Sequence, residues 1–250
     1  MDRLIYTAMT GAAQALEQQS TVANNLANAS TTGFRAQLST FRQVPMTFAD
    51  GSSGDSTRTF VLSSTPGADF APGPIQQTGN PLDVAIQGKG WLAVQAADGT
   101  EAYSRAGNLH VDANGQIVNA NNLPVLGNSG PMSVPTGADV TIGSDGTVTA
   151  LTPGDPPTSI ATIDQLKLVN PDPATLTRSD DGLFRTADGQ PADADPTVVV
   201  APASLEGSNV NAVSAMVDMI TNARQFQMQT KLMSTADQND QSANKLLEFS

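Results

Sequence analysis

The chain has 250 residues, enough for one large domain or for two to three small ones. Its 12 Lys and Arg against 24 Asp and Glu give a net charge of −12, which argues against the basic surface that nucleic-acid binding requires. There is no Cys, so disulfides are excluded, and no apolar run approaches the roughly 18 residues of a transmembrane helix.

The negative charge is concentrated in the middle of the chain. Residues 1–48 carry a net charge of +1, residues 49–204 carry −11 and residues 205–250 carry −2. Like charges repel, so a strongly acidic segment gains solubility, whereas near-neutral segments can pack against identical copies. We therefore expect an exposed middle and packed ends.

The N-terminal segment from Asp2 to Asn28 contains no Pro and only one Gly. Apolar and small residues recur there at alternating spacings of four and three, which predicts a helix with a heptad seam. The predicted seam consists of Ile5, Met9, Ala12, Leu16, Gln19, Ala23 and Leu26. Because Ala and Gln dilute this seam, we expect the helix to need partners for its stability.

A polar stretch from Ala23 to Ala36 closes this helix. It is rich in Asn and Thr, and it contains one Gly and one Phe, so it is too polar for a core. Asn and Gly are residues that typically end a helix. We expect the chain to bend here, with Gly33 allowing a backbone conformation that a side chain would hinder.

Residues 49–204 hold 18 of the 21 Gly and 15 of the 16 Pro. Short β-prone runs alternate there with Asp-Gly and Asn-Gly turns, which favours a compact antiparallel β domain. We expect this domain over residues 81–200, after an irregular, extended connector over residues 37–80. The segment Asp50–Ser56 is of low complexity, and we expect it to be mobile.

The C-terminal segment from Asn209 to Leu247 contains neither Gly nor Pro and is predicted to be a second helix. One stripe runs along Met216, Met219, Ala223, Phe226, Thr230 and Met233, and Val213, Val217 and Ile220 flank it early. Two stripes indicate contact with more than one neighbour. Ser208 is the expected N-cap of this helix.

Groups that could carry out chemistry are scarce. The single His, His110, lies in an alternating run that predicts a strand, so we expect a structural role for it. Asp112–Gly115 is only a fragment of a calcium loop, and Gly88-Lys89-Gly90 lacks the frame of a phosphate loop. We therefore expect no enzyme, no cofactor and no metal.

Four blocks of the sequence resemble the bacterial flagellar axial family, which comprises rod and hook proteins. They are Ala23–Ala36 (ANNLANASTTGFRA), Gly79–Val94 (GNPLDVAIQGKGWLAV), Tyr103–Gly127 (YSRAGNLHVDANGQIVNANNLPVLG) and Leu205–Gln238 (LEGSNVNAVSAMVDMI and onward). The blocks cover over a third of the chain and stand in the family's order. Within the family, the opening residues and the length are most similar to the proximal rod members, with the distal rod members as the nearest alternative.

The resemblance implies an α+β fold, with N- and C-terminal helices that form an inner, coiled-coil-like assembly domain, a central antiparallel β domain outside it and an irregular connector. The corresponding segments are 1–36 (helix and hinge), 37–80 (connector), 81–200 (β domain) and 201–250 (helix). It further implies a structural subunit of the periplasmic rod in the flagellar basal body, which transmits torque. The implied partners are other rod subunits and the flagellar type III export apparatus, with export requiring no cleaved signal peptide.

Two sets of residues are candidates for function. The expected assembly interface consists of Ile5, Met9, Leu16, Leu26, Val213, Met216, Met219, Ile220, Phe226 and Met233. The expected hinge consists of Asn24, Asn25, Asn28, Thr31, Thr32, Gly33 and Phe34. Two other interpretations of the residues are a binding or adhesive β protein with helical ends, and a hydrolase with an acidic site.

Overall fold

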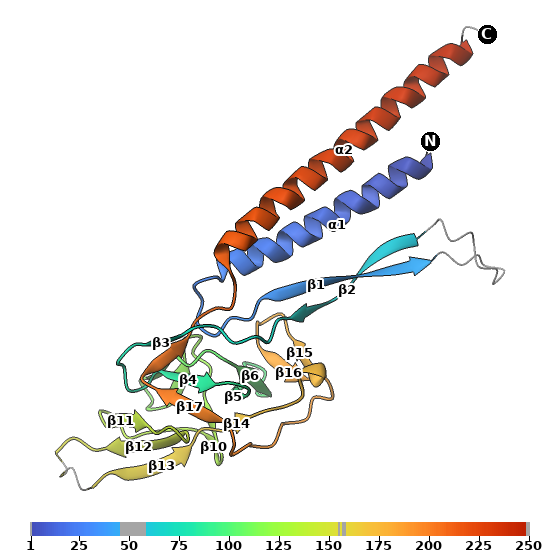
Figure 1. Cartoon of the computed structure of the whole chain (residues 1–250). Helices are drawn as coiled ribbons and strands as arrows, with labels where there is room; N and C mark the ends of the chain where they lie inside the picture. Colours follow the sequence, from blue (N-terminus) through green and yellow to red (C-terminus); the bar gives the residue numbers. More distant parts are fainter. Residues whose placement is uncertain (1, 46–58, 155, 157–158, 249–250) are drawn as a thin grey trace. The chain divides into compact units, whose positions relative to one another are not determined.

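A computed structural model of the chain describes residues 2–45, 59–154, 156 and 159–248 (Figure 1). It has a long helix at each end, α1 (Asp2–Ala27) and α2 (Ala212–Glu248), and the strands lie between them. The predicted mobile segment Asp50–Ser56 lies outside the described residues. The α+β fold class, with helical ends and a mostly antiparallel β middle, is confirmed.

The described strands are short, and only two of them, β1 and β2, exceed five residues. They are β1 (Gln37–Pro45), β2 (Thr59–Ala68), β3 (Ile75–Gln77), β4 (Val84–Gln87), β5 (Trp91–Gln95), β6 (Glu101–Ser104), β7 (Leu109–Val111), β8 (Ile117–Asn119), β9 (Leu126–Gly127), β10 (Gly130–Pro131), β11 (Asp139–Ile142), β12 (Thr147–Leu151), β13 (Ala161–Gln165), β14 (Leu168–Val169), β15 (Leu176–Arg178), β16 (Phe184–Thr186), β17 (Val199–Pro202) and β18 (Ser204–Glu206). A short 3-10 helix, Pro173–Thr175, precedes β15.

The chain divides into two compact units. The helical unit comprises Met1–Asn28, Gln37–Ala68 and Val210–Ser250, and the β unit comprises Ala29–Ala36 and Asp69–Asn209. The sequence therefore passes from one unit to the other four times. The predicted domain bounds group the residues differently and stay predictions.

The helical unit contains α1, α2 and the paired strands β1 and β2. The two helices lie side by side and run antiparallel (Figure 1). The connector, expected to be irregular and extended, is extended in β1 and β2, which pair in an antiparallel ladder with one register shift, between Leu38 and Thr40. The prediction of irregularity was wrong. Ser, Gln and Arg give these strands little β propensity, but antiparallel pairing over most of their length stabilises them.

The β unit is built from small antiparallel sheets. The largest has the order β14-β5-β6-β16-β15, and a second has the order β11-β12-β13. Four described pairs complete it: β17–β4, β18–β3, β7–β8 and β9–β10. The core is aliphatic, with Val, Leu, Ile and Ala from most of these strands, including the fully buried Val94, Ile117 and Val148. Burial of this apolar surface holds the unit together.

One aromatic cluster lies in the β unit around the only Trp of the chain. The Trp91 ring centroid is 4.6 Å from that of Phe184 and 5.8 Å from that of Phe70. Two guanidinium groups lie over these rings, because Arg105 is 5.5 Å from the Trp91 centroid and Arg178 is 5.9 Å from that of Phe184. Trp91 therefore reports on the packing of the β unit.

Two local predictions can be compared with the structure. The Asp-Gly turns form as expected, and Gly99 and Gly146 both have φ of +82°, which glycine adopts without strain. The N-cap prediction was wrong, because α2 begins at Ala212 and Asn211 caps it. The Asn211 side-chain oxygen accepts from the backbone N–H groups of Val213 at 3.0 Å and Ser214 at 3.1 Å. Asn competes well with Ser at this position.

Candidate assembly interface and junction

Small residues line the contact between α1 and α2 in the helical unit. On α1, the buried positions are Ala8, Ala12 and Ala15, and Ala15 is 0% exposed. Together with the partly buried Ile5, Gln19, Val22 and Leu26, they form a seam with spacings of three and four. We call this set, with its counterpart on α2, the packed seam. Four of its residues, Ile5, Ala12, Gln19 and Leu26, also belong to the predicted seam, whereas at the other three positions the preceding residue is buried or partly buried instead. Small side chains let two helices approach closely.

The matching seam on α2 mixes apolar and polar residues. It consists of Ala215, Met219, Asn222, Phe226, Gln229, Met233 and Ala236, at alternating spacings of four and three. A Cβ on Gly11 of α1 would meet the Gln229 side-chain amide at 3.0 Å, so Gly11 leaves room for that amide. Polar residues in such a seam weaken it and favour one register.

The ten predicted interface residues separate into two groups. Ile5, Leu26, Met219, Phe226 and Met233 are partly buried and belong to the packed seam. Met9, Leu16, Val213, Met216 and Ile220 are exposed, with Leu16 at 51% and Val213 at 72%. The structure therefore brings half of the set together and leaves the other half on the surface of the helical unit.

The exposed apolar residues follow a helical spacing of their own. On α1, Tyr6, Met9, Ala13 and Leu16 are spaced three, four and three, so they share one face. On the first turns of α2, Val213, Met216, Val217 and Ile220 form a second exposed group. We call these eight residues the open seam. Exposed apolar side chains that gather on one helix face can mark an interaction surface.

Asn side chains of the predicted hinge set close the C-terminal end of α1. Asn25 binds the backbone of Gln37 reciprocally: its Nδ2 donates to the Gln37 carbonyl at 2.9 Å, and its Oδ1 accepts from the Gln37 N–H at 2.7 Å. The Asn28 Nδ2 donates to the Asn24 carbonyl at 2.9 Å. Carbonyls in the last turn of a helix need such partners. These bonds explain why the stretch is rich in Asn.

Gly33 lies in the part of the motif that belongs to the β unit. Its φ is +68°, and an added Cβ would lie 2.2 Å from the carbonyl carbon of Arg105. Its N–H donates to the carbonyl of Glu206 at 2.8 Å. The next residue, Phe34, is buried beneath the Arg178 guanidinium, 4.8 Å from its ring centroid. A side chain at position 33 would thus meet both strain and a close backbone.

Thr31 and Thr32 lie in the turn before Gly33. The carbonyl of Thr31 accepts a hydrogen bond from the Phe34 N–H at 3.3 Å. Thr31 is exposed and Thr32 is partly buried. Their positions fit a tight connection, and their role in a hinge stays a prediction.

A buried ion cluster in the β unit was missed by the sequence analysis. Glu206, which is 0% exposed, lies between two nearly buried guanidinium groups. Its Oε1 is 2.7 Å from Arg35 Nη2, and its Oε2 is 2.8 Å from Arg105 Nη1. Arg35 is the only charged residue in the quoted motif Ala23–Ala36, and this was the available signal.

Backbone carbonyls accept further hydrogen bonds from the two guanidinium groups of the cluster. Arg105 donates to the carbonyls of Ile86 at 3.2 Å and Gly88 at 2.6 Å, and Arg35 donates to that of Ala71 at 2.8 Å. Burial lowers the pKa of the Arg105 guanidinium from its usual value, and the Glu206 carboxylate opposes this shift. Such a cluster stabilises a fold only when its members are paired in this way.

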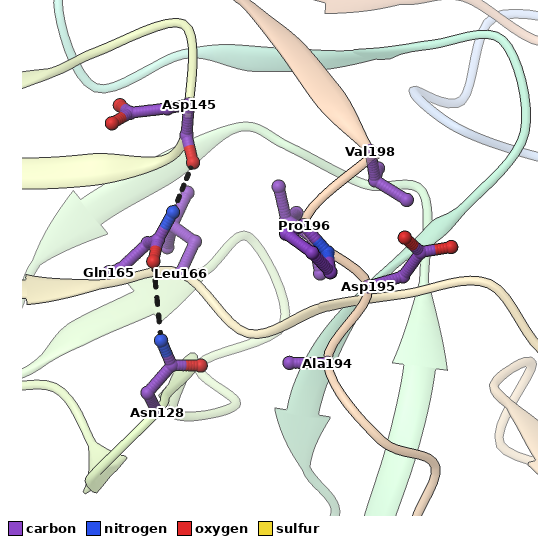
Figure 2. Close-up of a pocket in the computed structure, with 9 residues that line it drawn as sticks. Asn128, Asp145, Gln165, Leu166, Ala194, Asp195, Pro196 and Val198 are labelled. Atoms are coloured by element: carbon purple, nitrogen blue, oxygen red, sulfur yellow. Dashed lines mark hydrogen bonds between the residues drawn. The ribbon is translucent and has the colours of Figure 1, made fainter.

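A cavity of about 110 Å³ lies in the β unit (Figure 2). On one wall, the Gln165 side chain donates to the Asp145 carbonyl at 2.7 Å and accepts from Asn128 at 3.3 Å. On the other, the Asp195 carboxylate accepts from the Thr197 hydroxyl at 2.6 Å. These polar groups already have partners within the chain, so the cavity gives no sign of a ligand.

Other groups considered for chemistry lie apart. His110 is exposed on β7. Within the described residues, no three or more His, Asp or Glu side chains gather in a way that could hold a metal ion. The same residues include no helix that is both long and apolar enough to span a membrane.

Three family models match the chain. Residues 5–35 match the model described as flagella basal body rod protein, residues 85–150 match flagellar hook protein FlgE/F/G D1 domain, and residues 201–246 match flagellar basal body rod FlgEFG protein C-terminal. The first and third ranges contain most of both helices, and the second lies within the β unit.

Similar proteins extend this match to the full length. The flagellar basal-body rod protein FlgF of Salmonella typhimurium and that of Escherichia coli are each 52% identical to this chain over 256 residues, covering 100% of both chains. The flagellar basal-body rod protein FlgG of Agrobacterium fabrum is 33% identical, covering 92% of this chain and 95% of its own. This chain therefore belongs to the family of flagellar basal-body rod proteins.

Proposed function

We propose that the chain is a structural subunit of the flagellar basal-body rod. The observation that carries this proposal is the 52% identity, over the full length of both chains, to proteins named flagellar basal-body rod protein FlgF. Identity to the named FlgG proteins is lower, at 33% for that of Agrobacterium fabrum. The sequence resemblance to proximal rod members supports the proximal rod as the place of the subunit, with the distal rod as the alternative.

The subunit assembles through its terminal helices. The open seam supports this step, because it presents large apolar side chains that nothing in the described chain covers, such as Leu16 and Ile220. The packed seam supports it too, because Ala, Asn and Gln dilute its larger apolar residues, and a weak pair of helices inside one chain can join further helices in a coiled-coil-like layer. Helices joined in this way would transmit torque between subunits.

Export and location follow from the same proposal. The subunit lies in the rod of the basal body, where it contacts itself and other axial proteins, and it reaches this place through the flagellar type III apparatus without cleavage. The absence of Cys supports passage as an extended chain into an oxidising compartment, because free thiols there could cross-link wrongly. The subunit has no catalytic role, in keeping with the structural names of its relatives.

The test replaces residues of the open seam by Asp in a strain that lacks its own copy. Leu16→Asp and Ile220→Asp place a charge where the proposal requires apolar contact, so swimming in soft agar should be lost. Gln225→Asp is the matched control, because Gln225 is exposed and lies on another side of α2 from Ile220. That variant should swim like the parent.

Folding must be checked alongside motility. Helical circular dichroism of each purified variant should match that of the parent, because Leu16 and Ile220 are exposed on the helices. Normal swimming of both seam variants would refute assembly through the open seam. Loss of swimming in the Gln225 variant as well would show that any added charge on α2 is harmful, which would also contradict it.

A further inference from the structure

The chain crosses between its two units four times, and the β-unit ends of three of these passages lie close together. The passages fall at residues 28/29, 36/37, 68/69 and 209/210. The residues on the β-unit side of these points are Ala29–Ala36, the segment beginning at Asp69, and the segment ending at Asn209. The Asp69 N–H donates to the Ala36 carbonyl at 2.8 Å, which joins the second and third passages directly.

The Asn209 side chain connects three of these passages. Its Oδ1 accepts from the Ala36 N–H at 2.7 Å, and its Nδ2 donates to the carbonyls of Asp69 at 2.9 Å and Ala71 at 3.0 Å. Its own backbone N–H donates to the Phe34 carbonyl at 3.3 Å. One amide group thus uses its acceptor and its donor to hold segments that are far apart in the sequence.

Glu206 adds a second, charged connection three residues earlier. Its carboxylate pairs with Arg35 at 2.7 Å and also accepts from the Gly73 N–H at 2.9 Å. Its backbone carbonyl accepts from the Gly33 N–H at 2.8 Å. The same three segments are therefore tied twice, once by Asn209 and once by Glu206.

The two connections share a partner. The carbonyl of Ala71 accepts from Arg35 Nη1 at 2.8 Å as well as from Asn209 Nδ2 at 3.0 Å. Arg35 is in turn held by Glu206, so displacing the Glu206 carboxylate leaves a buried guanidinium without its partner, and displacing the Asn209 amide leaves the part-buried Ala36 N–H without its acceptor. Because an unsatisfied buried group is costly, such networks open together rather than bond by bond.

We infer that Asn209 and Glu206 fasten the β-unit ends of the passages into one cooperative clasp. In a rod subunit, a pull on either terminal helix then reaches the β unit through all the joined segments at once. The transmission of force rests on the proposed function, whereas the cooperativity of the clasp does not. Asn209 and Glu206 act as positioning residues: they hold Gly33–Ala36 and Asp69–Gly73 in place.

Hydrogen–deuterium exchange of the purified full chain tests the clasp. In Asn209→Ala, the N–H of Ala36 is the one backbone donor that loses its acceptor. If the clasp is cooperative, exchange should quicken by about tenfold or more at Ala36 and also at Gly33 and Gly73, which Asn209 does not touch. The amide of Ala93 in β5, bonded to the Lys167 carbonyl, should keep its parental rate.

Glu206→Gln is the second variant, and it should quicken exchange at Gly33, Ala36 and Gly73 from the charged side of the clasp. Glu101→Gln is the matched control, because Glu101 pairs with Lys167 at 2.8 Å elsewhere in the β unit. It should leave Gly33, Ala36 and Gly73 unchanged.

Two results would overturn the inference. In one, Asn209→Ala quickens exchange at Ala36 alone, which would make the contacts independent. In the other, Asn209→Ala quickens exchange at Ala93 as much as at Gly33, which would make the clasp an ordinary part of global unfolding. The experiment uses the isolated chain, so neither result depends on rod formation, whereas the proposed function stands or falls on motility.

Discussion

The carboxylate of Glu206 lies 2.7 Å from the guanidinium of Arg35, although Arg35 follows the N-terminal helix and Glu206 precedes the C-terminal one. Both side chains are nearly inaccessible to solvent. The pair therefore joins the two ends of the sequence inside the β unit. Removing either partner would leave a buried charge, which is far more costly than the loss of an exposed ion pair.

Glu206→Ala should destabilise the β unit strongly. It leaves Arg35 and Arg105 buried without their carboxylate, and breaking a buried pair in this way costs about 3–5 kcal/mol. Urea unfolding followed by Trp91 fluorescence measures the loss. Glu101→Ala is the comparison, since the Glu101–Lys167 pair is more accessible to solvent, and it should cost clearly less. Equal losses would contradict the importance of the cluster.

Gly33→Ala should cost more than an ordinary glycine replacement. The residue combines a φ of +68° with a backbone 2.2 Å from the position of a Cβ, so both strain and a clash result. Gly99→Ala separates the two effects, because Gly99 has a φ of +82° and nothing within 4 Å of its Cβ position. A left-handed conformation alone costs about 1–2 kcal/mol. The unfolding free energy of the Gly33 variant should fall by more than that.

Enlarging the packed seam should weaken the helix pair. Ala15 is fully buried between the helices, and Ala15→Leu would force them apart, which costs about 1–3 kcal/mol. Ala13→Leu adds the same atoms on the exposed face of α1 and should leave the pair intact. Thermal loss of helical circular dichroism in the free chain distinguishes them. A higher midpoint for the Ala15 variant would show that the seam has spare room.

Acid should destabilise the β unit through its Asp-x-Thr turns. In Asp98, Asp145 and Asp195, a hydrogen bond from the Thr hydroxyl two residues later is the main reason that the carboxyl pKa lies below 3.8. Because the folded pKa is lowered, the unfolded chain binds protons first. The stabilisation is thus complete above the unfolded pKa and is lost as the pH falls through the folded values.

The measurement is the urea midpoint of Trp91 fluorescence at a series of pH values from about 5 down to about 2.5. The midpoint should fall over this range. Thr100→Ala and Thr147→Ala remove two of the hydroxyl donors, so the double variant should show a shallower fall. An unchanged slope would mean that other carboxyls govern the acid response.

The sequence predicted most of the architecture, because the signals for it are local. Helical spacing placed α1 and α2 to within a few residues, and Asp-Gly pairs marked the turns that divide the β strands. The β1–β2 ladder was missed, since its pairing joins residues such as Gln37 and Ala68 that are 31 positions apart. Pairing between residues so far apart leaves no local pattern in the sequence, and the Ser, Gln and Arg of β1 do not alternate with apolar residues as a half-buried strand would.

The candidate site was predictable only in part. Spacing indicated that each helix carries more than one apolar face, but it could not decide which face packs inside the chain. Leu16 was expected in the seam, whereas the smaller Ala15 fills it, because close approach of the helices favours the smaller side chain. The clasp was not predictable, since Arg35, Glu206 and Asn209 meet only after the β unit has folded.

The central claim is that the open seam is covered by neighbouring subunits in the rod. Because the chain has no Cys, the single replacements Leu16→Cys, Ile220→Cys and Ala15→Cys can each be probed with a thiol reagent. We expect the thiols introduced at positions 16 and 220 to react in the free chain and to be protected in isolated rods, while the thiol at position 15 is protected in both. Equal reactivity of the thiols at positions 16 and 220 in the free chain and in rods would contradict the claim.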